Sequence, residues 1–312
     1  MTSFFAVPPL QEINSAIAHQ NNVELYVLRL DLMHPFVNGN KWFKLKYNLE
    51  AAKAQNFNKL LTFGGAYSNH IYATAAVGNL FGLQTIGVIR GEKSLPLNPT
   101  LDFAVSQGMQ LVYLDRQTYR QQQTAKLQEV LKNRFGDFFI IPEGGCNLHG
   151  VRGCTEIISN SAPLIKGDFD VICLACGTGT TLAGVTLSLH QKQHLIGFPV
   201  LKGGEFLKSA IETLLAEYLS SDLPMPGDKS ISWELICDYH FGGYAKVTEE
   251  LVTFQKEFGK LYQIPLDYIY TAKMFYGVMD LIQQKYFSNC RILLIHTGGL
   301  QGNLGIENRL ID

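Results

Sequence analysis

The stretch Asn38-Gly39-Asn40-Lys41 lies where an extended run, residues 23–32, gives way to a helical one. Beyond it, apolar residues recur at steps of three, four and three, the spacing of a buried helix stripe: Trp42, Leu45, Leu49 and Ala52. Lys41 is therefore expected at the edge of a sheet, where its amine can meet the carbonyl of a cofactor. Because most lysines are solvated surface charges, this prediction depends on two further segments.

The first further segment is Cys176-Gly177-Thr178-Gly179-Thr180-Thr181, between a strand-like and a helix-like run. Its glycines allow close approach to a ligand, and the helix start offers unpaired N–H groups that favour a phosphate. No lysine follows the last glycine, as a nucleoside-triphosphate loop requires, and Leu182 stands where a dinucleotide motif needs a third glycine. A monophosphate fits best, and a plain tight turn is the alternative.

The second is Gly64-Gly65-Ala66-Tyr67-Ser68-Asn69-His70, also between a strand and a helix. Capping of the following helix is the commoner role for Ser68 or Asn69. The functional alternative has Ser68 relaying a proton and Asn69 bonding a ring oxygen. A lone histidine at a helix start, such as His70, is more often structural. Together with Lys41, the two segments indicate a site for an anionic cofactor that carries a carbonyl group.

Composition narrows the class of protein. A length of 312 residues predicts two domains at ~150 residues each, and a net charge of −1 gives no footprint for nucleic acid or an anionic membrane. No apolar run approaches the ~20 residues of a membrane span, and residues 1–10 lack the pattern of a signal peptide. Six cysteines without framework spacing favour reduced thiols in a cytoplasm. Cys173 and Cys176 should point to opposite faces of a strand, so no metal site is expected.

Strand and helix patterns alternate, which predicts parallel α/β sheets. A first block has strands near 59–63, 85–89, 111–114 and 138–141, with helices near 70–81, 99–108 and 118–135. A second has strands near 170–176, 195–200, 233–238 and 291–296, with helices from 181 and near 248–262 and 272–287. Residues 220–230 are the most linker-like. Whether the early strand pairs with the later ones is left open by periodicity.

Three other segments follow or end strands: Gly242-Gly243-Tyr244, Tyr270-Thr271-Ala272-Lys273 and His296-Thr297-Gly298-Gly299. Ligands of open α/β sheets collect at the carboxyl ends of strands. A tyrosine there can act as an acid when a nearby cation lowers its pKa, although a half-buried core tyrosine is the commoner case.

Residues 38–41 with Lys44-Leu45, together with 64–69, 270–273 and 296–299, resemble the pyridoxal-phosphate family of 1-aminocyclopropane-1-carboxylate deaminase and D-cysteine desulfhydrase. The resemblance covers nearly the whole chain in order. It implies the tryptophan synthase β-like fold (fold type II), with two open parallel-sheet α/β domains and the cofactor between them. It also implies a large cofactor-binding domain of residues 1–53 and 151–312, a small inserted domain of residues 54–150, and a homodimer.

Residue by residue, the resemblance implies that Lys41 binds the pyridoxal phosphate aldehyde and then takes the substrate α-proton. Asn69 would contact the ring hydroxyl, Ser68 would serve the substrate carboxylate or proton transfer, and Tyr244 and Tyr270 would line the substrate side. Thr297 would face the pyridine nitrogen. The phosphate would be held by Gly177, Thr178, Gly179, Thr180 and Thr181.

The chain departs from the deaminase pattern at Thr271, where those enzymes have a glutamate beside the pyridine nitrogen, and at Ala272, where they have glycine. A hydroxyl from Thr271 or Thr297 leaves the ring a weaker electron acceptor than a carboxylate would. The pattern therefore favours β-elimination of D-cysteine, or a related β-substituted amino acid, to pyruvate, ammonia and sulfide; the expected partner is a small amino-acid substrate. The alternative is 1-aminocyclopropane-1-carboxylate deamination to 2-oxobutanoate. Outside this family, a non-catalytic carrier or a nucleotide-binding module stays open.

Overall fold

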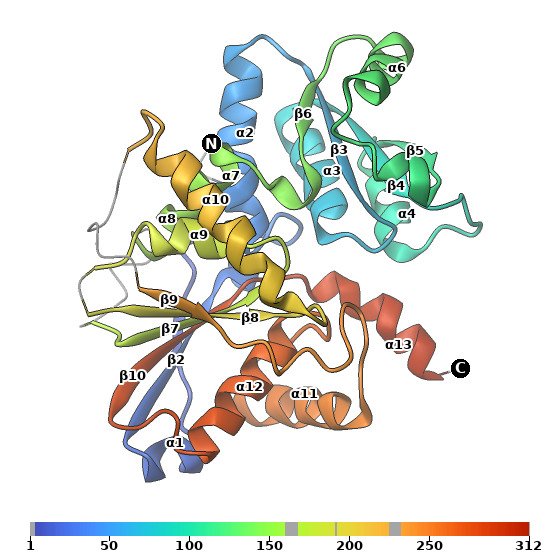
Figure 1. The fold of residues 1–312 in the computed structure, drawn as a ribbon. Helices are drawn as coiled ribbons and strands as arrows, with labels where there is room; N and C mark the ends of the chain where they lie inside the picture. The colour runs from blue at the N-terminus through green and yellow to red at the C-terminus, as the bar shows by residue number, and fades with distance from the viewer. Residues whose placement is uncertain (1–3, 160–167, 191, 225–231, 312) are drawn as a thin grey trace.

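The computed structural model of the chain describes residues 4–159, 168–190, 192–224 and 232–311, with side chains described up to residue 307. The predicted linker at 220–230 lies partly outside these ranges. The chain forms two parallel-sheet α/β domains, and Figure 1 shows the smaller, cyan-to-green one standing above the larger sheet. Among the described residues, every helix is too short or too polar to cross a bilayer.

The large domain has a six-stranded sheet in the order β1-β2-β10-β7-β8-β9. Its strands are β1 Leu10–Glu12, β2 Val23–Arg29, β7 Val171–Cys176, β8 His194–Pro199, β9 Trp233–Leu235 and β10 Cys290–His296. The early strand β2 pairs in parallel with the last strand β10, which settles the pairing that periodicity left open. The short β1, which the sequence pattern did not reveal, pairs antiparallel with β2.

Helices cover both faces of this sheet. One face carries α2 Asn40–Ala54, α7 Leu148–Cys154, α8 Glu156–Ser159, α9 Thr180–Thr186 and α10 Leu207–Leu219; the other carries α1 Ala16–Gln20, α11 Glu249–Tyr262 and α12 Thr271–Gln283. The last helix is α13 Asn303–Ile311. Cys173 packs in the core of one face and Cys176 in that of the other, which confirms their predicted opposite directions. Helix α10 had no counterpart in the sequence prediction.

The small domain has a four-stranded parallel sheet in the order β5-β4-β3-β6. Its strands are β3 Lys59–Gly65, β4 Gln84–Arg90, β5 Gln110–Leu114 and β6 Phe139–Ile141, and its helices are α3 Asn69–Phe81, α4 Pro99–Ser106, α5 Arg116–Tyr119 and α6 Ala125–Phe135. The predicted strands are confirmed. The single predicted helix at 118–135 was wrong, because the chain turns after α5 and Thr124 caps a new helix through the backbone N–H of Leu127.

The topology brings the segments that the sequence analysis singled out to one cavity. The strands of both sheets run into segments that line one cavity: the start of α2, the turn after β3, the β7–α9 loop and the turn after β10. The strand pairing places residues 10–29 with 171–296 and residues 59–141 in a sheet of their own. The domain boundaries at residues 53/54 and 150/151 stay predictions.

Candidate active site

A cavity of about 840 Å³ lies where residues of both domains meet, toward the upper end of the ~300–1,000 Å³ range of small-molecule sites. The structure brings ten of the predicted site residues to its wall: Lys41, Ser68, Asn69, Gly177, Thr178, Gly179, Thr181, Tyr244, Tyr270 and Thr297. Thr180 and Thr271 lie outside the lining.

Lys41 is the second residue of α2, and a glycine fixes where that helix begins. Gly39 has φ +66°, and a Cβ at this position would lie 1.9 Å from the Thr297 carbonyl oxygen. Only glycine therefore lets the turn before α2 pack against the turn after β10. The Asn40 N–H donates to the same carbonyl at 3.3 Å. The sequence thus holds the start of α2, and with it Lys41, against the turn after β10.

The amine of Lys41 is tuned by its surroundings. Burial, followed by the neighbouring ammonium of Lys44, lowers the pKa of Lys41 to about 7. Its Nζ donates to Asn40 Oδ1 at 2.9 Å, and the Asn40 amide donates in turn to Thr181 Oγ1 at 2.8 Å. Much of this amine is therefore neutral near pH 7, the form that attacks a carbonyl.

Lys44 was absent from the predicted site residues. It lies one helical turn after Lys41, on the same side of α2. Its side chain is buried, 4 % exposed, and burial lowers its pKa. Its Nζ lies 3.4 Å from Thr178 Oγ1, and no carboxylate pairs with it in the described part of the chain. The lysine-x-x-lysine spacing was the available signal.

His70 carries an unpaired acceptor. The Thr62 hydroxyl donates to the Ile141 carbonyl at 2.7 Å, so the His70 Nε2–H must be the donor to Thr62 at 2.9 Å. The Nδ1 atom then holds a lone pair, is buried, and has no partner within the described residues. Burial and the nearby Lys41 and Lys44 push the His70 pKa well below its usual value, so the ring is neutral.

Two predicted threonines have structural partners. Thr271 is fully buried, and its hydroxyl donates to Asp267 Oδ2 at 2.6 Å. Thr180 is also buried and shares a 3.0 Å hydroxyl contact with Thr178. Of the two hydroxyls predicted near a pyridine nitrogen, Thr297 therefore faces the cavity and Thr271 supports the turn behind it.

The turn after β3 combines a cap with a cavity wall. Ser68 Oγ accepts the N–H groups of His70 and Ile71 at 3.2 and 3.3 Å, which is the capping role that the sequence analysis considered the commoner one. Ser68 also lines the cavity, where its own hydroxyl hydrogen remains available as a donor. Asn69 Oδ1 accepts from Gln301 at 2.7 Å, so this side chain is tied to the segment after β10.

The two predicted tyrosines of the cavity, Tyr244 and Tyr270, differ from the expectation that a nearby cation lowers their pKa. Tyr270 donates a hydrogen bond to Tyr244, and their rings meet edge to face at 6.1 Å. Burial raises the pKa of both phenols, far above the usual value for Tyr270. The nearby Arg90 favours ionisation of Tyr244, but burial outweighs it. Both phenols therefore keep their proton and act as hydrogen-bond donors.

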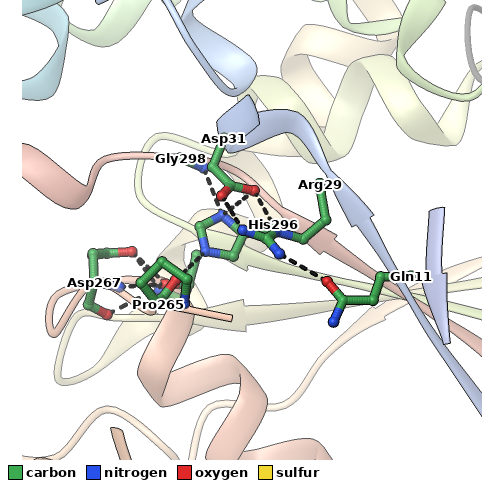
Figure 2. A network of polar contacts seen from close by, with 8 residues as sticks. Gln11, Arg29, Asp31, Pro265, Asp267, His296 and Gly298 are labelled. Carbon is green, nitrogen blue, oxygen red and sulfur yellow. Dashed lines mark hydrogen bonds and ion pairs between the residues drawn. The ribbon is translucent and has the colours of Figure 1, made fainter. Parts of the chain in front are cut away.

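A buried polar network supports the turn after β10 (Figure 2). Arg29 grips Asp31 with two hydrogen bonds of 2.9 and 2.6 Å, and His296 Nδ1 lies 3.4 Å from the same carboxylate. His296 Nε2 donates to the Pro265 carbonyl at 2.7 Å, and its Nδ1 accepts the Gly298 N–H at 3.2 Å. The network therefore fixes the segment that carries Thr297.

These groups fit pyridoxal phosphate. A phosphate at the Thr178 loop would neutralise the uncompensated ammonium of Lys44, and a largely neutral Lys41 can bond an aldehyde. His70 Nδ1 offers a buried acceptor, unpaired among the described residues, near both lysines. The glycines of the loop leave room for the anion. Fold and site together define a lysine-dependent cofactor enzyme built on two parallel sheets.

Comparison with known proteins agrees with this class. The family model described as pyridoxal-phosphate dependent enzyme (PALP) matches residues 4–298, and the chain belongs to this family. Pyridoxal phosphate is therefore its cofactor, and its fold is fold type II.

The relatives carry two names. A Pyrococcus horikoshii protein provisionally named 1-aminocyclopropane-1-carboxylate deaminase is 31% identical, over 97% of this chain and 93% of the relative. The D-cysteine desulfhydrase of Yersinia enterocolitica is 27% identical, over 93% and 91%. The crystal structure of an ACC deaminase homologue superposes with a TM-score of 0.86 at 29% identity, covering 98% of this chain and 93% of that one.

Proposed function

We propose that this protein is a lyase that converts D-cysteine, or a related β-substituted amino acid, to pyruvate, ammonia and sulfide. The observation that carries the proposal is Lys41, a cavity amine whose pKa lies at about 7. Such an amine can bond an aldehyde and, once displaced by the substrate, remove the α-proton at neutral pH. When bound, pyridoxal phosphate supplies the aldehyde and an electron-accepting ring.

The other residues have separate tasks in this proposal. Lys44, Gly177, Thr178, Gly179 and Thr181 hold the phosphate, and Thr180 supports Thr178 from behind the loop. Asn69 and Thr297 orient the ring from its two edges. Ser68 donates to the substrate carboxylate from the start of α3, and the protonated phenols of Tyr244 and Tyr270 bound the substrate side.

Thr271 supports elimination over ring opening. Thr271 stands where the deaminases have a glutamate, and its hydroxyl donates to Asp267. Position 271 therefore supplies no carboxylate to the pyridine nitrogen of the cofactor. Eliminating a thiolate demands less of the ring than opening a cyclopropane, which has no α-proton to remove. The names of the relatives keep 1-aminocyclopropane-1-carboxylate deamination as the second candidate. Release of 2-oxobutanoate from that substrate would identify it.

The test begins with Lys41. Borohydride reduction of the cofactor-loaded protein, followed by peptide mapping, should leave a pyridoxyl group on this residue. Lys41→Ala should lose the visible absorbance of the lysine-bound cofactor, and pyruvate release from cysteine should fall by at least ~10²–10⁴-fold. Lys46→Ala is the matched control, because Lys46 is on the same helix but pairs with Glu156 at 2.6 Å. A pyridoxyl group elsewhere, or full activity of Lys41→Ala, would contradict the assignment.

Assays with each cysteine enantiomer define the substrate. Pyruvate and sulfide should appear in equal amounts with D-cysteine. We further propose a cytoplasmic homodimer without nucleic-acid or membrane partners. Light scattering on a sizing column tests the dimer, and a mass of 34.8 kDa for the particle would exclude it.

A further inference from the structure

Two arginines of the small domain line the cavity and have no role in the proposed chemistry. Arg90 is the last residue of β4, and Arg116 is the first residue of α5, which follows β5 after the single residue Asp115. Strands β4 and β5 are neighbours in which Arg90 is opposite Leu114, and the Gly91 N–H donates to the Leu114 carbonyl at 2.8 Å. The two side chains therefore arise from adjacent strand ends on one rim.

Neither guanidinium has an anionic partner among the described residues. Arg90 lies over the Tyr119 ring at 5.6 Å, and its Nη2 would be 3.5 Å from a Cβ on Gly65. The carboxylate of Asp115, next to Arg116, accepts instead from Gln117, Thr118 and the Thr118 hydroxyl. Both cations therefore remain available to a ligand.

The strand order of the small-domain sheet sets the order of the residues along its rim, the carboxyl edge that borders the cavity. Along the carboxyl edge of the sheet, the order β5-β4-β3-β6 places Arg116 first, Arg90 second, the Ser68 turn third and Glu143 last. Neighbouring strands lie ~4.8 Å apart. The cations are thus one and two strands from the Ser68 turn. The backbone of Glu143 is on the other side of this turn, but its side chain reaches back and accepts from the Gln122 amide at 3.4 Å, near the Tyr119 ring that lies beneath Arg90. An extended substrate anchored at Ser68 therefore meets two guanidinium groups, without ion-pair partners in the ranges that the structure describes, when it extends toward β4 and β5.

We propose that Arg90 and Arg116 form a subsite for a second anionic group, carried by the β-substituent of the substrate. This inference rests on the proposed function and narrows its substrate class to β-substituted alanines with an acidic leaving group, such as a carboxylated thiol. Guanidinium groups suit carboxylate and sulfonate oxygens because they present planar pairs of donors.

The reaction keeps its balance with such a substrate. Lys41 takes the α-proton, the electron pair of the Cα–H bond forms the Cα–Cβ double bond, and the Cβ–S bond breaks with its pair on sulfur. The thiolate takes a proton, and one water converts the remaining fragment to pyruvate and ammonium. The subsite holds the departing anionic tail and leaves these bonds untouched.

The experiment uses two thioether substrates that differ by one carboxylate, S-(2-carboxyethyl)cysteine and S-propylcysteine, each as both enantiomers. Pyruvate release by the cofactor-loaded protein should give a kcat/KM at least about tenfold higher for the carboxylated substrate, the scale of one charge-assisted hydrogen bond. Added salt should reduce this preference, because the rim is exposed.

Variants locate the preference. Arg116→Gln and Arg90→Gln should each lower kcat/KM for the carboxylated substrate and leave S-propylcysteine within about twofold, whereas Arg116→Lys should keep part of the preference. Arg120→Gln is the matched control, since Arg120 is an exposed arginine of the same segment outside the cavity. Arg120→Gln should leave the preference intact.

Failure of this inference and failure of the proposed function look different. If S-propylcysteine is turned over as well as the carboxylated substrate, or if Arg116→Gln slows both equally, the subsite is wrong and the lyase stands. If neither thioether nor cysteine yields pyruvate and the protein forms no visible cofactor band, both proposals are overturned.

Discussion

Asp267 and Asp115 each accept backbone N–H groups at the start of a helix beside the cavity, and they differ in their exposure to solvent. Asp267 accepts the N–H groups of Ile269, Tyr270 and Thr271 at 3.0, 2.7 and 2.9 Å ahead of α12 in the large domain. Asp115 accepts those of the two residues after Arg116, at 2.9 and 3.0 Å, ahead of α5 in the small domain. Asp267 is 1 % exposed, whereas Asp115 is exposed.

The difference separates two kinds of cavity wall. Around Asp267, on the large-domain side, water is largely excluded, so each N–H donor depends on its protein partner. On the small-domain side, water can replace a lost partner, and the arginines remain free to meet a substrate. The same local hydrogen-bond pattern therefore occurs in a buried wall of the cavity, on the large-domain side, and in an exposed wall, on the small-domain side. The buried wall supports the residues of the proposed reaction, and the exposed wall carries the two arginines of the proposed substrate subsite.

The largest expected effect concerns Asp31, the most deeply paired carboxylate of the buried wall. Asp31→Ala leaves Arg29 buried without its partner, and loss of one member of a buried pair costs about 3–5 kcal/mol. Glu24→Ala, which removes an exposed pair with Arg291, should cost ~0–1 kcal/mol. Urea unfolding measures both. Equal losses in the free energy of unfolding would mean that burial does not decide how much an ion pair contributes to stability here.

The aspartate pair itself gives the second prediction. Asp267→Ala leaves two buried N–H donors and one partly buried N–H donor without their acceptor and should lower the free energy of unfolding by more than about 2 kcal/mol. Asp115→Ala should cost clearly less, because solvent takes over its role. Urea unfolding of the cofactor-free protein compares them, and a larger loss for Asp115→Ala would break the comparison.

Lys44 is expected to show opposite effects on stability and on cofactor binding. Lys44→Met removes an uncompensated buried ammonium, so the cofactor-free protein should gain ~1 kcal/mol or more. The same change should weaken pyridoxal phosphate binding at least about tenfold, since a charge-assisted phosphate contact is lost. Lys46→Met is the control on the same helix. Tighter cofactor binding by Lys44→Met would refute the phosphate role.

Lys41 is expected to give a pH dependence of stability and of cofactor capture. Its folded-state pKa of about 7 lies below the usual 10.5, so burying the ammonium costs stability below pH ~7, and this cost disappears as pH rises from ~7 to ~10.5. Capture of pyridoxal phosphate by the cofactor-free protein should accelerate between about pH 6 and 8 and then level off. A rate that keeps rising to about pH 10 would show an ordinary lysine.

Much of the site could be predicted because its signals are local. Gly39 before Lys41, the apolar stripe of α2 and the cap at Ser68 each depend on a few neighbouring residues. Lys44 was missed because its importance comes from a missing counter-charge, which only packing reveals. The break in the predicted helix at 118–135 was missed because residues 120–124 contain no glycine or proline to mark it, while Thr124 starts a new helix.

The sequence by itself determined the strand-to-helix turns, the lysine at the start of α2 and the cofactor class, because backbone freedom, helix periodicity and motif order are written in consecutive residues. Only the tertiary structure decided that β2 lies beside β10, that Thr271 bonds Asp267 behind the wall, and that the arginine rim is open. The physical reason is desolvation: whether a charge or hydroxyl is tuned, satisfied or free depends on which distant segments exclude water from it.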